Sequence, residues 1–214
     1  MPRKVVAAIL AAGSSSRFGS PKQLANFGEK TLIDLALDAA IGTSAENICV
    51  ILGCNFEQIY THLANRKQGG EGRFHTLHNL NWKEGLSSSI YAATSFAKEV
   101  NATHLLMLVC DQPLVTWQLL ESLLGLLDDR PVPNGTDGSN HSAPNAIVAC
   151  KYENSVGIPA VFPAIYFNEL MALKGDKGAK SIIMRSTAPI LVNFPEGSAD
   201  IDQPGDLSNL LRSD

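Results

Sequence analysis

Apolar runs rich in Val and Ile alternate along this chain with longer segments whose apolar residues recur at helical spacing. Short continuous runs suit buried strands, and apolar residues three or four positions apart suit helices packed on a sheet. We expect strands at residues 5–10, 47–52, 74–78, 104–109, 146–150 and 190–193, and helices at about 31–41, 56–64, 85–98, 119–127 and 206–211. Strands that alternate with helices form βαβ units, whose parallel sheet is covered on both faces. The chain is therefore predicted to be α/β: a single Rossmann-like three-layer α/β/α domain with a mostly parallel sheet.

The size and charge of the chain exclude some classes of partner. A length of 214 residues suits one domain, and a net charge of −4 with 45% hydrophobic residues is ordinary for a globular protein. We therefore expect no nucleic acid polymer as a partner, although a local basic pocket would not show in the total charge. No apolar run approaches the length of a membrane-spanning helix, so no membrane association is expected. Residues 131–144 are rich in Pro, Gly, Asn and Ser, which predicts a flexible loop, more simply an insertion than a lid.

The N-terminus has a competing interpretation as a secretory signal. Arg3 and Lys4 precede the apolar stretch 5–12, an order that signal peptides share. That stretch is short for a signal, and the residues after it carry functional chemistry. The cysteines are scattered without a CxxC pair, at Cys49, Cys54, Cys110 and Cys150. This pattern favours reduced thiols and a cytoplasmic location.

Parallel sheets bind ligands beyond the carboxyl ends of their strands, here the loops after residues 10, 78 and 109. The first of these loops combines Gly13 and three serines with Arg17 and Lys22. Glycine permits a tight turn with exposed backbone N–H groups, and both cations can bind phosphate oxygens. The spacing fits neither the Walker loop GxxxxGK[ST] nor the dinucleotide motif GxGxxG with its acidic partner. Taken alone, the loop suits a phosphate site and a polar turn about equally.

The resemblance to a known family rests on six segments in one order. LAAGSSSRFGSPKQ, from Leu10 to Gln23, resembles the LAAGxSxRxGxxK motif of nucleotidyltransferases. The other segments are NLNWKEGLSSS from Asn79, CDQPLVT from Cys110, GIPAVF from Gly157, GDKGAK from Gly175 and DIDQPGDL from Asp200. Together they are similar, over nearly the whole chain, to the molybdenum cofactor cytidylyltransferases of the MobA-like NTP transferase superfamily.

Three departures from the family pattern stand out besides the insertion at 131–144. Cys110 stands where glycine is usual, and Phe18 where methionine is usual. The stretch 151–156, KYENSV, replaces an arginine-rich stretch that often precedes the G-x-P segment. None of these changes removes a charged group that phosphate chemistry needs, but the last leaves open how an anionic second substrate is held.

The resemblance implies a nucleotidyltransferase fold and a cytidylyl transfer. CTP and a molybdopterin-type cofactor with a terminal phosphate would give a dinucleotide form of the cofactor and pyrophosphate. Such a step consists mainly of positioning and charge neutralisation. Arg17, Lys22 and Asp111 would be the catalytic residues, and Asp111 and Asp202 would share Mg²⁺, or Mn²⁺ in its place. Two carboxylates with substrate phosphates suffice for magnesium.

The same resemblance assigns contacts to both substrates. Residues 1–115 would form the nucleotide-binding part, and 116–214 the part for the second substrate. The expected nucleotide contacts are Leu10, Ala11, Ala12, Gly13, Ser14, Ser15, Ser16, Arg17, Lys22, Asn79, Gly85, Ser88 and Ser89. The expected contacts to the second substrate are Gln112, Pro159, Asp176, Lys177 and Lys180.

Local alternatives accompany these assignments. Asp111 and Asp202 could merely begin turns, and the serines after Gly85 could merely start a helix. Trp82 suits packing better than base stacking. His75 and His78 fall on opposite faces of a strand, which argues against a metal pair.

Three functions remain open from the sequence. The first is the cytidylyltransferase, with a molybdoenzyme of the xanthine dehydrogenase type as a further partner. The second keeps the fold and metal but uses GTP or another NTP and a different phosphorylated acceptor. The third is a non-catalytic protein that binds the cofactor and hands it to a molybdoenzyme. The third is disfavoured by four charged residues, because a site without catalytic activity would not need them: Arg17, Lys22, Asp111 and Asp202.

Overall fold

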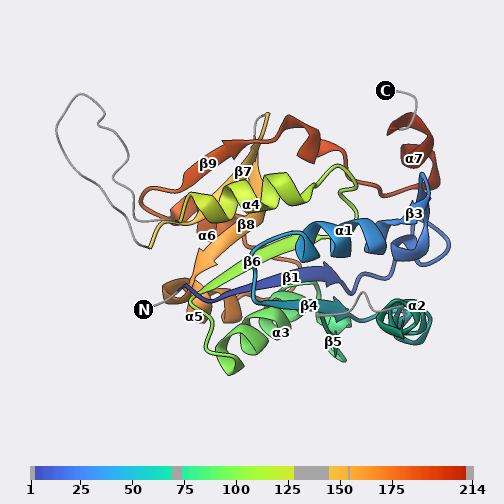
Figure 1. Ribbon diagram of the computed structural model, residues 1–214, viewed down its shortest axis with the longest axis horizontal. Coiled ribbons are helices and arrows are strands. Elements are labelled where there is room, and N and C mark those ends of the chain that lie inside the picture. The colour runs from blue at the N-terminus through green and yellow to red at the C-terminus, as the bar shows by residue number, and fades with distance from the viewer. Residues whose placement is uncertain (1–2, 69–73, 128–144, 154, 211–214) are drawn as a thin grey trace.

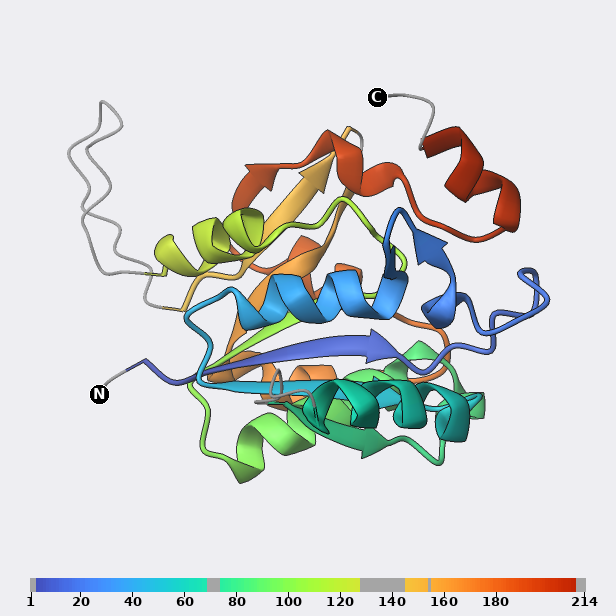
Figure 2. The same cartoon turned by 45° about the vertical axis from the view of Figure 1, so that its right-hand side comes forward.

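A computed structural model describes residues 3–68, 74–127, 145–153 and 155–210 (Figure 1). The loop predicted at 131–144 lies outside the described residues. Figures 1 and 2 show a central sheet with helices on both of its faces, as the sequence predicts. No helix within the described ranges is long and apolar enough to cross a membrane.

Seven strands form the central sheet in the order β5-β4-β1-β6-β8-β7-β9. Their bounds are β1 Val5–Ala11, β4 Asn47–Leu52, β5 His75–His78, β6 His104–Val109, β7 Val148–Tyr152, β8 Ser155–Pro163 and β9 Ile190–Asn193. β1 pairs in parallel with β4 on one side and with β6 on the other. β8 runs antiparallel to both of its neighbours, β6 and β7. The predicted mostly parallel sheet is confirmed.

Helices and a small hairpin connect these strands. The α-helices are α1 Leu32–Ile41, α2 Phe56–Gln68, α3 Leu86–Glu99, α4 Trp117–Gly125, α5 Phe167–Met171, α6 Lys180–Arg185 and α7 Pro204–Leu210. The 3₁₀ helices are η1 Lys22–Leu24, η2 Trp82–Glu84, η3 Ala164–Tyr166 and η4 Pro195–Ser198, and the hairpin consists of β2 Asn26–Phe27 and β3 Lys30–Thr31. In Figures 1 and 2, α1 and α4 cover one face of the sheet, and α3 and α5 cover the other.

The side chains of β1 explain why both faces are covered. Every residue of this strand is buried, and successive side chains enter two different apolar clusters. Val5, Ala7, Ile9 and Ala11 pack with residues of α1 and α4. Val6, Ala8 and Leu10 pack with residues of α3, α5 and α6. A strand that is buried on both faces reads as a continuous apolar run, which is the pattern in this sequence.

The structure differs from the sequence prediction mainly in its C-terminal half. β8 was not predicted, because Gly157 and Pro159 interrupt its apolar run and both residue types are uncommon inside strands. α5 and α6 were not predicted either. The helix expected from residue 119 begins at Trp117, because the Thr116 side chain accepts a hydrogen bond from Leu119 N and caps it.

Candidate active site

A cleft of about 350 Å³ lies beyond the carboxyl ends of β1 and β6. This is the edge at which parallel α/β sheets bind their ligands. Its lining comes from the loop after β1, the end of β6 and the segment that leads into α3. The lining residues are Leu10, Ala11, Ala12, Gly13, Ser14, Lys22, Gln23, Trp82, Lys83, Gly85, Leu86, Ser89, Val109, Cys110, Asp111 and Asp176. The cleft therefore brings together residues from four of the segments that the sequence singles out, since Asp176 belongs to the segment that begins at Gly175.

Gln23 holds the loop after β1 in its conformation. Its side chain is buried, and its Nε2 donates hydrogen bonds to the carbonyl oxygens of Ala11, at 2.9 Å, and Gly13, at 3.1 Å. Its Oε1 accepts a hydrogen bond from the Ser15 hydroxyl, and Ser15 Oγ in turn accepts one from Lys22 N. The predicted phosphate-binding serine Ser15 thus bonds within the loop. Gln23 was not among the predicted site residues, although it directly follows Lys22 in the motif.

Lys22 lies between the two predicted metal ligands. Its Nζ is 2.6 Å from Asp111 Oδ2 and 3.3 Å from Asp202 Oδ1, and it donates to Ile201 O at 3.0 Å. Burial alone would lower the pKa of the Lys22 ammonium, but Asp111, by charge and hydrogen bonding, raises it above its ordinary value. Lys22 is therefore a charged ammonium group that lies between two carboxylates.

Backbone and side-chain contacts bring Asp202 to the end of β6. Ile201 N donates a hydrogen bond to Asp111 O at 2.9 Å, which joins the late DID segment to the residue after β6. Asp206 Oδ2 accepts hydrogen bonds from the backbone N–H groups of Asp202 and Gln203. Arg17 NH1 lies 3.0 Å from Asp202 Oδ2, with both side chains substantially exposed. Residues 180 positions apart in the sequence thus form one charged cluster.

A third carboxylate, that of Asp200, adds negative charge to the same region. Partial loss of solvent and the charge of Asp111 raise the pKa of Asp200 above its ordinary value. Asp200 begins the DID segment but was not predicted as a site residue. Its signal was the alternation of two aspartates around Ile201, which is itself fully buried.

The donor set of this cluster fits a magnesium-type ion only if substrate completes it. The described residues contain no group of three or more His, Cys, Asp or Glu side chains that could hold a metal. Asp111 and Asp202 already share one cationic group, the Lys22 ammonium. Mg²⁺ commonly binds one or two carboxylates together with substrate phosphates and water, so this pair meets its requirement.

The segment before α3 forms another wall of the cleft. Gly85 has φ of +94°, and a side chain there would meet Asp176 Oδ1 and the Gly175 backbone at about 2.5 Å. Asn79 is buried, and its Nδ2 donates to the hydroxyls of Ser88 and Ser89. Gly85 and Ser89 therefore line the cleft, whereas Asn79 and Ser88 support it from behind.

Trp82 combines the packing role that the sequence favours with a place on the cleft wall. A side chain at Gly53 would lie 2.5 Å from Trp82 Cβ, so the absence of one lets the indole approach β4. Lys83 Nζ lies 5.5 Å from the indole centroid, within the range of a cation–π contact. Lys83 and Trp82 line the cleft but were not predicted as site residues.

The residues predicted to bind the second substrate do not lie together in the structure. Asp176 lines the cleft, and Lys177 and Lys180 line a separate cavity between α5 and α6. Gln112 is buried and donates through Nε2 to Gly197 O at 2.8 Å. Pro159 is buried within β8. The geometry thus separates these five residues into a cleft residue, two cavity residues and two buried residues.

The comparison with protein families decides the class of this chain. A model of the MobA-like NTP transferase domain matches residues 7–190. The chain belongs to this family. The match includes the loop after β1, the end of β6 and the segment before α3, but it ends before Asp202. Family and fold together support a nucleotidyltransferase, an enzyme that transfers part of an NTP.

Solved structures agree with this MobA-like fold. The Rv0371c protein of Mycobacterium tuberculosis H37Rv is 24% identical with a TM-score of 0.73, and the match covers 99% of this chain and 100% of that one. A second structure of that protein, a complex with manganese, is 22% identical over 99% of this chain and 100% of that one, with a TM-score of 0.69.

Two further structures show the same fold. A nucleotidyl transferase from Methanothermobacter thermautotrophicus is 16% identical, with a TM-score of 0.73 and full coverage of both chains. The molybdopterin-guanine dinucleotide biosynthesis protein A of Archaeoglobus fulgidus is 16% identical, with a TM-score of 0.62 and coverage of 97% of this chain and 98% of that one. At these identities the likeness establishes the fold.

Proposed function

We propose that this MobA-like protein transfers a cytidylyl group from CTP to a molybdopterin-type cofactor and releases pyrophosphate. The observation that carries the proposal is the contact of Lys22 with both Asp111 and Asp202 at the mouth of the first loop. A cation and two carboxylates beside exposed backbone amides match the needs of a metal-bound triphosphate.

The reaction forms one P–O bond and breaks another. An oxygen of the acceptor's terminal phosphate attacks the α-phosphorus of CTP, and the bond from that phosphorus to the bridging oxygen of pyrophosphate breaks. The loop from Ala12 to Ser16 binds the β- and γ-phosphates through backbone N–H groups. Arg17 and Lys22 offset the negative charge that develops on the departing pyrophosphate.

Asp111 and Asp202 would hold a divalent ion, Mg²⁺ or Mn²⁺. When bound, such an ion neutralises phosphate charge and orients the reacting groups. The manganese complex of the Mycobacterium tuberculosis protein supports a divalent ion for this fold. Asp200 strengthens the negative field of the pair without entering it in this structure.

Lys22 would exchange partners when substrates bind. Its ammonium neutralises the carboxylates that the ion would need, so ion and ammonium compete for the same charges. The triphosphate offers Lys22 an alternative anion a short distance away along the same loop. Lys22 would therefore move from the carboxylates to the phosphates when the nucleotide binds, which would leave Asp111 and Asp202 to hold the ion.

The remaining contacts follow from their place in the cleft. Gly85 and Ser89 would lie near the base and ribose, with Asn79 and Ser88 holding that wall. Asp176 would face the second substrate, whereas Lys177 and Lys180 line the separate cavity and Gln112 and Pro159 are buried. The four cysteines are free thiols, which is consistent with a reducing cytoplasm. The proposed function would make a molybdoenzyme of the xanthine dehydrogenase type the recipient of the product.

A second candidate keeps the chemistry and changes the substrates. The Archaeoglobus fulgidus neighbour carries guanine in its name, which favours GTP as an alternative nucleotide. The base-facing wall offers backbone and hydroxyl groups at Gly85 and Ser89, which either base could use. A non-catalytic carrier of the cofactor is favoured by none of these observations.

The deciding experiment measures pyrophosphate release from each of the four NTPs, with Mg²⁺ or Mn²⁺, with and without molybdopterin cofactor. We expect release from CTP that depends on the cofactor and on the ion. Release from GTP with the same cofactor would move the protein to the second candidate. Binding of cofactor without turnover of any NTP would support the carrier instead.

A further inference from the structure

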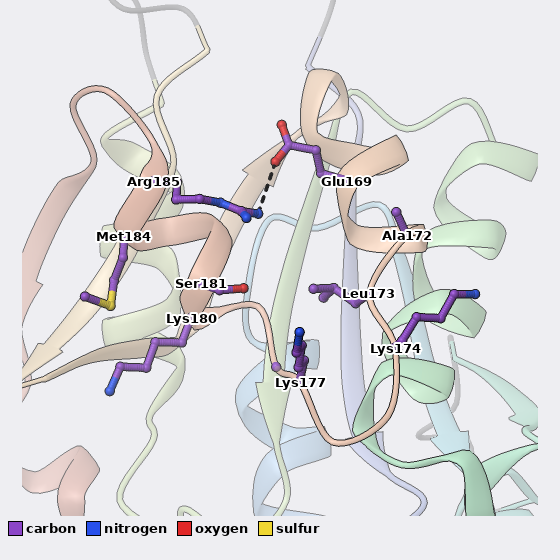
Figure 3. Close-up of a pocket in the computed structure, with 10 residues that line it drawn as sticks. Glu169, Ala172, Leu173, Lys174, Lys177, Lys180, Ser181, Met184 and Arg185 are labelled. Carbon is purple, nitrogen blue, oxygen red and sulfur yellow. Dashed lines mark ion pairs between the residues drawn. The ribbon is translucent and has the colours of Figure 1, made fainter.

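A second cavity lies between α5 and α6, two of the helices that pack on the same face of the sheet as α3. Its volume is about 690 Å³, roughly twice that of the active-site cleft. Glu169 and Ala172 line it from α5 and the residue after it, and Ser181, Met184 and Arg185 line it from α6. The loop of residues 173–178 joins these helices and closes one end of the cavity (Figure 3).

The cavity collects positive charge in a chain whose net charge is negative. Its lining carries four cationic side chains and one carboxylate: Lys174, Lys177, Lys180, Arg185 and Glu169. The whole chain has a net charge of −4. A local excess of cations of this kind favours an anionic occupant.

Two of these lysines have no partner among the described residues. Lys180 donates to Ser155 Oγ at 2.7 Å, and Arg185 NH2 lies 3.7 Å from Glu169 Oε2. Lys174 and Lys177 have neither a hydrogen bond nor an ion pair from their side chains within the described ranges. Figure 3 shows the Lys177 ammonium directed into the space between the helices, with the Ser181 hydroxyl turned toward the same space. A cation and a hydroxyl that converge on one space can bind a phosphate group together.

The rest of the lining is apolar. Ala172, Leu173 and Met184 contribute to it, and Met184 is 68% exposed. An exposed methionine beside a cavity adapts its shape to an apolar group that enters. The lining therefore suits a molecule with an anionic end and a nonpolar or aromatic body.

We propose that this cavity is a second binding site, separate from the nucleotide cleft, for a small phosphorylated molecule with a nonpolar body. Lys177 and Ser181 bind its phosphate, Lys174 adds positive charge at the rim, and Met184 and Leu173 contact its body. The proposal does not depend on which nucleotide or acceptor the cleft uses.

The wall between the two sites couples them. Asp176 lines the nucleotide cleft, whereas Lys174 and Lys177 on the same loop line the cavity. Gly175 O accepts a hydrogen bond from Ser87 N in the first turn of α3. An occupant that restrains this loop therefore also restrains the wall of the cleft around Gly85.

Methionine methyl NMR can observe the cavity directly. The chain has four methionines, and Met184 lines the cavity while Met107 is buried in β6. The full chain is titrated with three probes. Phenyl phosphate carries both the anionic end and the aromatic body of the proposed ligand. Inorganic phosphate carries the anion alone, and benzyl alcohol carries the aromatic body alone. We expect a saturable shift of the Met184 signal with phenyl phosphate, with a dissociation constant on the order of a millimolar for so small a ligand. The other two probes should bind more weakly.

Charge-reversal variants of the lining lysines test whether the probe binds in this cavity. Lys174→Glu with Lys177→Glu should weaken the Met184 response about tenfold or more, because two attractions become repulsions, each step of about 1.4 kcal/mol being tenfold. Lys151→Glu makes one such charge change at an exposed position of β7, outside this lining but in a neighbouring cavity that shares Lys180 and Met184, and should leave the response unchanged, as should Lys22→Met in the cleft. An unchanged Met107 signal checks that each variant is folded.

Two results would overturn the proposal. One is an absent Met184 shift, or a shift weakened equally by Lys151→Glu, which would leave a general charge effect or place the probe in the neighbouring cavity that Lys151 and Met184 both line. The other is a response that Lys22→Met abolishes, because the probe would then bind in the nucleotide cleft. Neither result bears on pyrophosphate release, so the proposed function stands or falls separately.

Discussion

Two loops of this protein present lysines in opposite states. In the loop after β1, Lys22 is 14% exposed and has three oxygen partners, two of them carboxylates. In the loop between α5 and α6, Lys177 is exposed and has no side-chain partner among the described residues. Both loops border cavities, and both belong to segments that resemble the family's motifs.

The difference lies in what each lysine must do before it can bind an anion. Lys22 must leave Asp111 and Asp202, so its binding is coupled to whatever replaces it between them. Lys177 has nothing to leave, so its affinity for an anion depends only on its own surroundings. A paired lysine therefore suits a step that must wait for two ligands, and an unpaired lysine suits simple capture. The predictions below test this contrast.

Removal of the central carboxylate should have the largest effect. Asp111→Asn keeps the shape of the side chain but removes half of the charge that an ion and Lys22 share. We expect turnover in the pyrophosphate assay to fall by about 10²–10³, the usual loss for one preorganised electrostatic group. Asp38→Asn, in the ion-pair group of α1, is the matched control and should retain turnover. Equal activity of Asp111→Asn and the parent protein would remove Asp111 from the mechanism.

The support of the first loop should give the next largest effect. Gln23→Ala leaves the carbonyl oxygens of Ala11, which is buried, and of Gly13 without their side-chain donor. We expect a loss of about 1–3 kcal/mol in the free energy of unfolding, measured in urea, with a raised KM for the NTP. Gln58→Ala, on the exposed side of α2, should change stability by less than about 0.5 kcal/mol. A raised KM without any loss of stability would show that Gln23 contacts the nucleotide instead.

The sequence predicted the N-terminal half of the fold well because its signals are local. β1, β4 and β6 are unbroken apolar runs, and Thr31 caps α1 at the predicted position, with its side chain accepting from Asp34 N. The C-terminal half gave weaker signals. β8 is completed by pairing with β6, a contact between distant parts of the chain that no local pattern records.

The candidate site shows the same difference between what local sequence signals predict and what depends on contacts between distant parts of the chain. Lys22, Asp111 and Asp202 could be named from motifs, and the structure places the Lys22 ammonium in contact with both carboxylates. The sequence could not show that the lysine lies between the carboxylates, because that depends on the Ile201–Asp111 backbone bond. Nor could it separate Asp176, in the cleft, from Lys177, its neighbour in the chain, which lines the other cavity.

Metal binding tests the coupling that distinguishes Lys22. Lys22→Met removes the competing cation, so we expect the affinity for Mn²⁺ without nucleotide to rise about tenfold, equivalent to about 1.4 kcal/mol. Calorimetry measures this directly and needs no turnover. Lys83→Met, which lines the cleft but lies over Trp82, should leave the affinity nearly unchanged. A weaker Mn²⁺ affinity in Lys22→Met would mean that the lysine organises the carboxylates rather than competing for them.

The smallest effect, on the free energy of unfolding, should come from replacing Lys177, the lysine without a side-chain partner among the described residues. Lys177→Met removes a side chain without a partner among the described residues, so the free energy of unfolding should change by less than about 0.5 kcal/mol. Lys22→Met, in contrast, leaves two carboxylates facing each other at a partly buried site, and should lose about 1–3 kcal/mol. Urea unfolding of both variants at low salt gives the comparison, and added salt should narrow the gap by screening the carboxylates. A loss for Lys177→Met as large as that for Lys22→Met would mean that both lysines are structural cations and that the contrast between the two loops is wrong.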